Sequence, residues 1–242
     1  MRVRSALDAF AQGAIDPGGL FVLAASAGNE AIAGVILGQR LAAAAGQFTV
    51  PVVRSGMPAT ATDALVAHVC GWLRGHGARL LQCLPTDDEA PLAAPLLRHG
   101  FLHPTGMTFL RHDLLCLPSL PSPSHLACLR YPAVSPADFA TTLLRTYEGT
   151  LDCPEMNGVR SIDEVIEGHR PHGLHDPSRW WLVTRQGRPV AVLLMAEMAT
   201  GEWEVAYVGV VPEEQRGVGA AVVAFALDRA RRRCRRCHPV GG

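Results

Sequence analysis

Two hydrophobic patterns alternate along the chain. Short, β-branched or alternating apolar runs predict strands at residues 20–27, 31–38, 48–53, 79–84 and 107–114, and again at residues 129–134, 180–184, 189–198 and 205–211. Apolar spacings of three to four residues predict helices at residues 5–15, 61–75, 89–99, 135–147 and 161–168, and a last helix after Gly219. Strands and helices mixed in this way predict an α/β fold built on a mixed sheet.

Local signals support several of these boundaries. Gly28-Asn29-Glu30 and Gln186-Gly187 separate paired apolar runs and are typical of hairpin turns. Ser135 is placed as a helix N-cap, and Ser161 with Glu164 has the spacing of a capping box.

The chain divides into two halves around a segment rich in proline and serine. Residues 115–125 (LCLPSLPSPSH) predict a linker between a domain at 1–114 and a domain at 126–242. Both halves contain hairpin strands, a further strand and an alanine-rich helix, which is a weak internal repeat.

The stretch from Glu204 to Arg233 is the most informative part of the chain. A buried strand ends at Pro212, a polar loop follows, and Gly217-Val218-Gly219 leads into a helix. The first turn of a helix offers backbone N–H groups without intrahelical partners, and glycines allow a phosphate to approach them. An ordinary tight turn between strand and helix is the alternative interpretation.

The wider stretch, with its V-x-V-x-P strand end and R-G-V-G-A-A turn, resembles the acyl-CoA-binding motif of the GNAT superfamily of N-acetyltransferases, written Q/R-x-x-G-x-G/A. Two registers fit the motif. One takes Gly217 and Gly219 as the glycine pair and places Glu214 where Gln or Arg is usual. The other takes Arg216, Gly219 and Ala221, and shifts the helix start. The first is preferred because it puts Val222 and Val223 at the family's buried apolar pair.

The resemblance implies an acetyl-CoA site in the second half. The strand end would pair with the pantetheine amides, and the helix start would hold the pyrophosphate. The residues that the resemblance assigns to the cofactor are Val208, Val210, Val211, Gln215, Arg216, Gly217, Val218, Gly219 and Ala220.

The first half resembles a GNAT domain whose motif has decayed. Met57 and Pro58 stand where the motif would place a glycine and an N–H donor, and proline has no N–H. Near Gly100, the run LRHGFL resembles the L-x-x-x-G-F end of such a domain. The expected architecture is therefore two GNAT-like acyl-CoA N-acyltransferase domains in tandem. The second is incomplete, since only RRRCRRCHPVGG follows its last predicted helix.

Two carboxylates are candidates for the catalytic base. Glu202 and Glu204 flank Trp203 at the start of the key strand, and strand alternation places both on one face. An ammonium must lose a proton before it can attack a thioester, and a carboxylate in this place performs that role in the family. The family's acceptor pocket maps onto the loop at residues 147–157, whose candidate substrate-binding residues are Tyr147, Glu148, Asp152, Glu155 and Asn157.

Composition excludes some functions. The formal net charge is zero and charged residues make up 18% of the chain, which disfavours nucleic acid and membrane surfaces as partners. Seven scattered cysteines predict reduced thiols and a cytoplasmic location. The Cys234-x-x-Cys237-His238 pattern matches haem attachment or a metal site, but no further ligand is evident. His169, His172 and His175 are interpreted as a polar loop, and no metal is expected.

The sequence thus predicts an acetyl-CoA-dependent N-acetyltransferase that transfers its acetyl group directly to an amine of a small molecule or protein. A homodimer is compatible with this prediction. A non-catalytic CoA-binding or protein-interaction module is the alternative.

Overall fold

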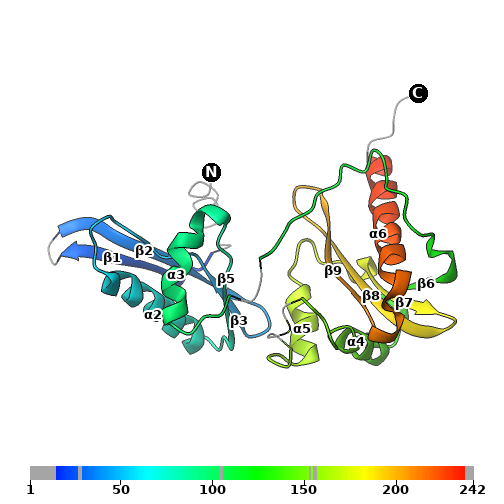
Figure 1. The fold of residues 1–242 in the computed structure, drawn as a ribbon, viewed down its shortest axis with the longest axis horizontal. Coiled ribbons are helices and arrows are strands. Elements are labelled where there is room, and N and C mark those ends of the chain that lie inside the picture. Colours follow the sequence, from blue (N-terminus) through cyan, green and yellow to red (C-terminus); the bar gives the residue numbers. More distant parts are fainter. Residues whose placement is uncertain (1–14, 27–28, 104–105, 153, 155–156, 238–242) are drawn as a thin grey trace. The chain divides into compact units, whose positions relative to one another are not determined.

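The structure, a computed structural model, describes residues 15–26, 29–103, 106–152, 154 and 157–237 of the 242-residue chain. It divides into two compact units, Met1–Pro104 and Thr105–Gly242, each with its own sheet (Figure 1). The helix predicted at residues 5–15 lies outside the described residues except for Ile15.

The sheet of the first unit is mixed. Its strands are β1 (Leu20–Ser26), β2 (Asn29–Leu41), β3 (Ala45–Phe48), β4 (Val52–Val53) and β5 (Leu80–Cys83). The order is β1-β2-β3-β5, and β4 also pairs with β2. All pairs are antiparallel except β3 with β5, which is parallel.

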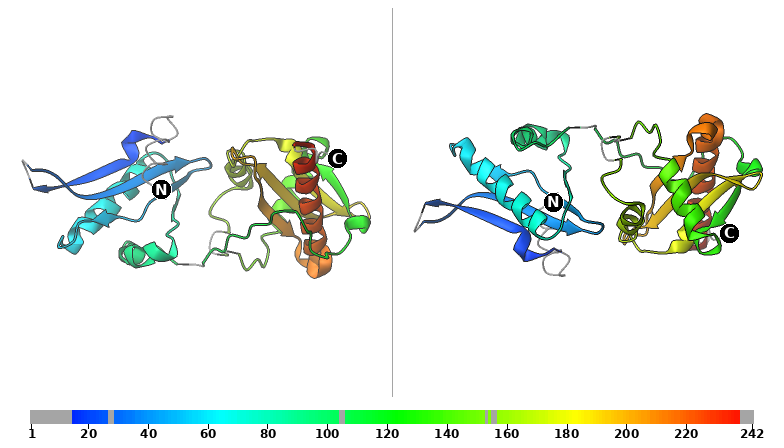
Figure 2. Two further views of the ribbon diagram at one scale, coloured as in Figure 1. Left: turned by 90° about the horizontal axis from the view of Figure 1, so that it is seen from above. Right: turned by 90° about the horizontal axis from the view of Figure 1, so that it is seen from below.

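Helices α2 (Ala59–Gly75) and α3 (Ala90–Arg98) cover one face of this sheet. α2 presents Leu65, Val66, Val69 and Leu73 at helical spacing, and all four are buried against the strands. Leu96 of α3 joins the same core. Both views in Figure 2 show α2 and α3 on the same side of the first unit's sheet.

The sheet of the second unit is antiparallel, in the order β6-β7-β8-β9. Its strands are β6 (Ala127–Arg130), β7 (Trp180–Arg185), β8 (Arg188–Glu197) and β9 (Trp203–Val210). β8 is buried on both faces, because neighbouring residues such as Leu193 and Leu194 point to opposite sides and both are fully buried. β9 pairs only with β8 among the described residues, so its other side is a sheet edge.

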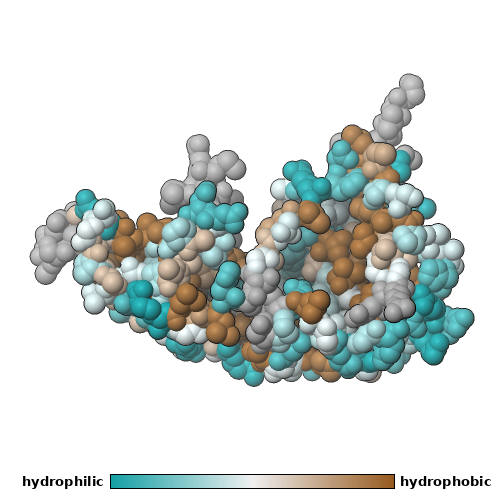
Figure 3. Space-filling model, in the orientation of Figure 1, coloured by the Kyte–Doolittle hydropathy of each residue, from teal (hydrophilic) through white to brown (hydrophobic). Residues whose placement is uncertain are grey.

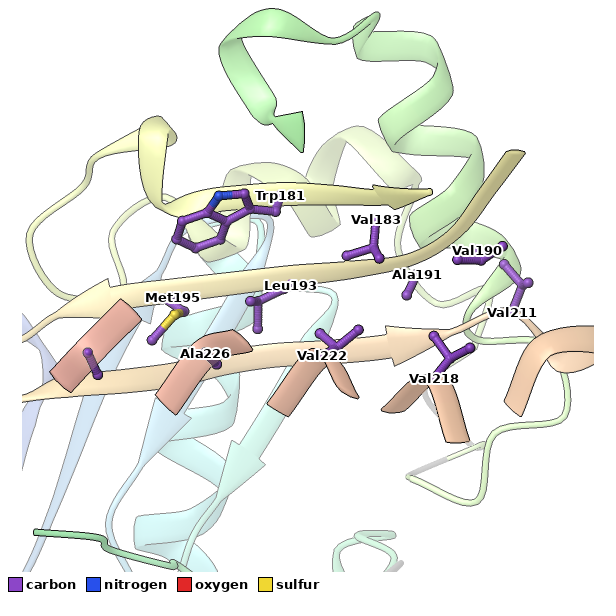
Figure 4. Packing of buried hydrophobic residues seen from close by; sticks show 11 residues of the cluster. Trp181, Val183, Val190, Ala191, Leu193, Met195, Val211, Val218, Val222 and Ala226 are labelled. Carbon is purple, nitrogen blue, oxygen red and sulfur yellow. The ribbon is translucent and has the colours of Figure 1, made fainter. Parts of the chain in front are cut away.

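Three helices enclose this sheet. α4 (Pro136–Arg145) and α5 (Ile162–His169) form one core with β7 and β8, in which Phe139, Leu143 and Ile166 are buried. α6 (Gln215–Cys237) packs on the opposite face, and Figure 4 shows Val218, Val222 and other members of that second core between helix and strands. None of the helices among the described residues combines the length and apolar character needed to cross a bilayer.

Several predicted elements differ in the structure. Residues 107–114 were expected to form a strand, but they belong to the second unit and are neither strand nor helix. The single strand expected at 48–53 is replaced by β3 and β4, and Pro51, which cannot donate to a ladder, lies between them. The strand expected at 129–134 ends at Arg130, where a short 3-10 turn (Tyr131–Ala133) begins.

Candidate functional site

The junction between β9 and α6 brings a sheet edge to a helix N-terminus. After Val211, a 3-10 turn at Pro212–Glu214 leads directly into α6 at Gln215. The helix was expected to begin after Gly219, so this start is earlier. Gly217 and Gly219 therefore lie in the first two turns of the helix and not in a loop ahead of it.

The two glycines of this junction have different environments. Gly217 has φ of +82°, a conformation that costs an L side chain strain, and a Cβ built there meets nothing within 4 Å. Gly219 has no such φ, and a Cβ at that position would make an ordinary 3.8 Å contact with Val210 Cγ2. The first turn of α6 is thus open at Gly217, while Gly219 faces the end of β9.

Two acidic residues of the 3-10 turn are neutralised by arginines from other elements. Glu213 accepts a 2.7 Å hydrogen bond from Arg145 at the end of α4. Glu214 accepts a 2.5 Å hydrogen bond from Arg185 at the end of β7. Both carboxylates lie just before the positive end of the α6 dipole, and the arginines offset their negative charge.

The edge of β9 is exposed where the cofactor was expected to pair. Val205 and Val208 are 41% and 37% exposed, and Figure 3 shows apolar residues over β9 and α6 in the second unit. Val210 packs against the α6 core. Val211, by contrast, donates its N–H to Val190 O and accepts at its carbonyl from the Glu214 N–H. Its N–H is therefore committed within the fold, which leaves Val208–Val210 as the edge.

The remaining residues assigned to the cofactor form the beginning of α6. Gln215 and Arg216 are its first two residues, and their side chains lie outside the described atoms. Val218 is fully buried in the core between α6 and the sheet, and Ala220 is half-buried. The atoms that these residues contribute to the junction with β9 are therefore backbone atoms.

The two candidate bases occupy different positions. Glu204 lies within β9 opposite Ala196, and its Oε2 is 3.2 Å from His172 Nε2, an ion-pair distance without hydrogen-bond geometry. Glu202 precedes β9, so the expected strand alternation does not extend to it. Its carboxylate contacts Arg111 and accepts a 3.2 Å hydrogen bond from the Thr200 hydroxyl.

The predicted acceptor loop lies at the end of α4. Tyr147 is half-buried, and its ring centroid lies 5.4 Å from that of Tyr207 on β9. Asn157 donates its side-chain amide to Tyr147 O at 3.1 Å. Glu148 and Asp152 are exposed, and Asp152 is near enough to act electrostatically on Tyr147 and Tyr207. Glu155 lies outside the described residues.

A chain of hydroxyl groups connects this loop to β9. Thr146 Oγ1 donates to Leu143 O at 2.6 Å and lies 2.7 Å from the Tyr207 hydroxyl. Because the Thr146 hydroxyl has one proton, Tyr207 must donate to Thr146 when Leu143 O accepts that proton. The ring of Tyr147 lies beside that of Tyr207. The proton positions are therefore ordered from Tyr207 through Thr146 to a backbone carbonyl.

Burial determines the protonation states in this cluster. It raises the pKa of both Tyr147 and Tyr207, so both phenols stay protonated near neutral pH. His169, the last residue of α5, has its ring 5.9 Å from that of Tyr207. Burial, assisted by Arg160 and His172, lowers the pKa of His169 to about 4, so its imidazole is neutral.

Because the imidazole of His169 is neutral in the folded chain, the free energy of unfolding should depend on pH. Its pKa is about 4 in the folded chain against 6.5 for an ordinary histidine, so between these values the unfolded chain binds more protons. The free energy of unfolding should therefore fall as the pH drops through this window, by up to about 1.4 kcal/mol per pH unit. His169→Asn should remove this contribution. Urea unfolding of both proteins across the window, followed by tryptophan fluorescence, measures it.

The control for this prediction is His175→Asn, at an exposed histidine whose ring lies against Trp180. Comparison with this variant separates the effect of replacing a histidine with asparagine from the effect of the buried imidazole of His169. An unchanged slope in the His169 variant would show that this imidazole is not held neutral by the fold.

Several residues of the site were not predicted from the sequence. They are Arg145, Thr146, His169, Arg185, Tyr207 and Gly209. Gly209 had the clearest available signal, because an isolated glycine within a strand pattern often marks a close backbone approach. The arginines and hydroxyls gave no local signal, since their partners lie far away in the sequence.

No cluster of metal ligands accompanies the site. Within the described part of the chain, no three His, Cys, Asp or Glu side chains gather closely enough to hold a metal ion. The side chains of Cys234–Cys237, and all of His238, lie outside the described atoms. The haem or metal alternative therefore stays without structural evidence.

Comparisons with known proteins identify the fold. No family model and no curated protein sequence matches the chain. Among solved structures, the chain is similar to a GCN5-related N-acetyltransferase from Sphaerobacter thermophilus, with a TM-score of 0.53 and 14% identity over 89% of this chain and 68% of that one. It is also similar to a fungal multi-domain GH3 beta-N-acetylglucosaminidase that contains a GCN5-related glucosamine N-acetyltransferase region. That match has a TM-score of 0.52 and 17% identity.

The second match covers 88% of this chain and 29% of the fungal protein, so the chain spans less than a third of that relative. At these identities the likeness establishes the fold alone. The mixed α/β architecture expected from the sequence is confirmed as similar to that of GCN5-related N-acetyltransferases.

Proposed function

We propose that this protein is an acetyl-CoA-dependent N-acetyltransferase that transfers the acetyl group directly to an amine of a small molecule or a protein. The observation that carries the proposal is the junction of β9 and α6. An exposed sheet edge leads there into a helix whose first turn is open at Gly217. The fold, which resembles that of N-acetyltransferases, supports the same conclusion.

The junction has the groups that acetyl-CoA requires. Backbone N–H groups in the first turn of α6 would bind the pyrophosphate, because they have no intrahelical partners and lie at the positive end of the helix dipole. The edge at Val208–Val210 would hydrogen-bond to the pantetheine amides, as an added strand does. These two contacts would fix the direction of the thioester along β9, and orientation is a large part of what such a site can supply.

The arginines beside the junction make it compatible with an anion. Unpaired carboxylates at Glu213 and Glu214 would repel a pyrophosphate at the start of α6. Arg145 and Arg185 offset these charges, and they anchor the turn to α4 and β7. They are therefore positioning residues for the cofactor in this proposal.

The acceptor amine would bind on the face of β9 that carries Glu204 and Tyr207, and not at the edge proposed for the cofactor. Glu204 takes a proton from the acceptor ammonium, which frees the nitrogen lone pair. The nitrogen then forms a bond to the acetyl carbon, the carbon–sulfur bond breaks, and the electron pair leaves on sulfur. The second proton of the nitrogen passes to solvent as the amide forms, and coenzyme A departs as its thiolate. Tyr147, Tyr207 and His169 are uncharged near neutral pH and would line this region without competing for the proton.

The wider organisation is also part of the proposal. The two units are proposed to be tandem GNAT-like domains, with a single cofactor site in the second. In the first unit the corresponding helix, α2, has Pro58 as its N-cap, and proline offers no N–H to a phosphate. We place the protein in the cytoplasm, without nucleic-acid or membrane partners.

Isothermal titration calorimetry with acetyl-CoA tests the site. One site per chain is expected, and Gly219→Glu should weaken binding at least tenfold, or about 1.4 kcal/mol, because it places a negative charge beside the end of β9. The matched control, Gly219→Ala, adds only an ordinary contact and should bind normally. Full-strength binding by Gly219→Glu would contradict the site. Tight binding without turnover over a broad amine panel would indicate a non-catalytic CoA-binding module.

A further inference from the structure

The sheet of the first unit has one face that no helix of that unit's described residues covers. α2 and α3 both contribute to the core that contains Phe21, Ile36 and Phe48, on the other face. Strand alternation places Leu20, Val22, Val35, Leu37 and Val52 on the opposite side, together with Gln39, Gln47 and Gln82. We call these eight residues the helix-free face.

The helix-free face is apolar and accessible. Val22 and Val52 are 52% and 50% exposed, and Leu20 is 40% exposed. Val22 and Val52 are both paired with Val35 of β2, so their side chains form one continuous row across three strands. Exposure of these apolar side chains to water is unfavourable, so a partner that covers them would gain stability.

The polar part of this face is a row of glutamines without charge. Gln47 pairs in register with Gln39 on one side and Gln82 on the other, and Gln82 Nε2 donates to Gln47 Oε1 at 3.4 Å. None of the eight residues is charged. A charged protein or nucleic acid would therefore find no complementary group on this face.

These features fit a second copy of the same chain. In a two-fold interface the same patch meets itself, so the patch must be self-complementary. Apolar side chains satisfy this condition, and so do primary amides, because each has both a donor and an acceptor. We propose that the helix-free face binds the helix-free face of a second copy, forming a face-to-face sheet interface. This proposal is independent of the acetyltransferase proposal.

Sedimentation equilibrium of the full chain tests the interface. The parent protein should show a monomer–dimer equilibrium, and Val22→Glu or Val52→Glu should raise the dimer dissociation constant at least about a hundredfold, because each buries an unpaired charge. The matched control is Leu110→Glu, at a leucine that is 92% exposed in the other unit. That variant should dimerise like the parent protein. Circular dichroism of each variant checks that the fold is retained.

A second measurement locates the contact without mutation. In a mixed sample of isotope-labelled and unlabelled chains, intermolecular nuclear Overhauser effects should involve the methyl groups of Val22, Leu37 and Val52. A monomer throughout the accessible concentration range would overturn the proposal, as would a dimer indifferent to both glutamate variants. A monomeric full chain that dimerises only after removal of residues 2–14 would assign this face to the N-terminal segment instead.

Discussion

Replacing Gly209 with valine is expected to lower the free energy of unfolding of the second unit by roughly 3 kcal/mol, the upper part of the range for overpacked sites. A Cβ atom at this position would lie 2.6 Å from the Cβ and Oγ1 atoms of Thr146 and from the Tyr207 hydroxyl. Carbon atoms do not make contacts this short, so α4 would have to move away from β9. The same movement would break the hydrogen bond between Thr146 and Tyr207.

Urea unfolding with linear extrapolation measures this effect. Gly219→Ala is the control, because its Cβ would make an ordinary contact with Val210, and alanine favours a helix over glycine by up to about 1 kcal/mol. The two glycine replacements should therefore change stability in opposite directions. If the valine variant were as stable as the parent protein, the close approach of α4 to β9 would be refuted.

The elements with strong local signals were predicted well. The capping box at Ser161 and Glu164 is present at the start of α5, and the Ser135 hydroxyl accepts from the Asp138 N–H at the start of α4. The turn at Gln186-Gly187 does join β7 and β8, with both residues in the left-handed region. These features depend on contacts within a few residues, so the sequence pattern contains the information.

The turn between β2 and β3 shows where local signals fail. Ala43 and Ala44 both have positive φ, of 63° and 51°, although alanine is disfavoured there. Nothing in the run Ala42–Ala45 predicts a hairpin turn, and an alanine run is more typical of a helix. The pairing of β3 with β2 and β5 holds this turn in place, and that pairing cannot be seen locally.

The strand predicted at residues 107–114 is wrong for a related reason. Their apolar positions are compatible with a strand, but a strand needs a neighbour to satisfy its backbone groups. In the structure Phe109 and Leu110 are 82% and 92% exposed, and this segment pairs with no strand among the described residues. An apolar pattern is therefore evidence for a strand only where the topology offers an edge.

Candidate site residues that follow one another in β9 could be predicted from the sequence, whereas the contacts of β9 with other elements could not. The sequence pattern indicated Glu204 and the junction between β9 and α6, because those residues follow one another in the chain, although α6 begins at Gln215, earlier than expected. Tyr207 and Thr146 are 61 residues apart in sequence, and their contact depends on how α4 packs on the sheet. The arginine partners of Glu213 and Glu214 come from 68 and 29 residues away. Such non-local pairs leave no periodic signal.

Glu204→Gln should reduce acetyl transfer at neutral pH by roughly 100-fold or more, the usual contribution of a general base. Glutamine keeps the size of the side chain but cannot accept a proton from the acceptor ammonium. At high pH the amine loses its proton to solvent, so the difference between the two proteins should shrink. Steady-state rates measured against pH with saturating acetyl-CoA test this expectation. Calorimetry should show unchanged acetyl-CoA binding.

Glu202→Gln provides the comparison that separates the two candidate carboxylates. Glu202 lies before β9 and is held by Arg111 and Thr200, whereas Glu204 is in the strand beside His172. If the base must be on the face of β9 that carries Tyr207, only the Glu204 variant should lose activity at neutral pH. A larger loss in the Glu202 variant would transfer the role to that residue. Equal rates in both variants and the parent protein would mean that the amine loses its proton to water, and that β9 contributes orientation alone.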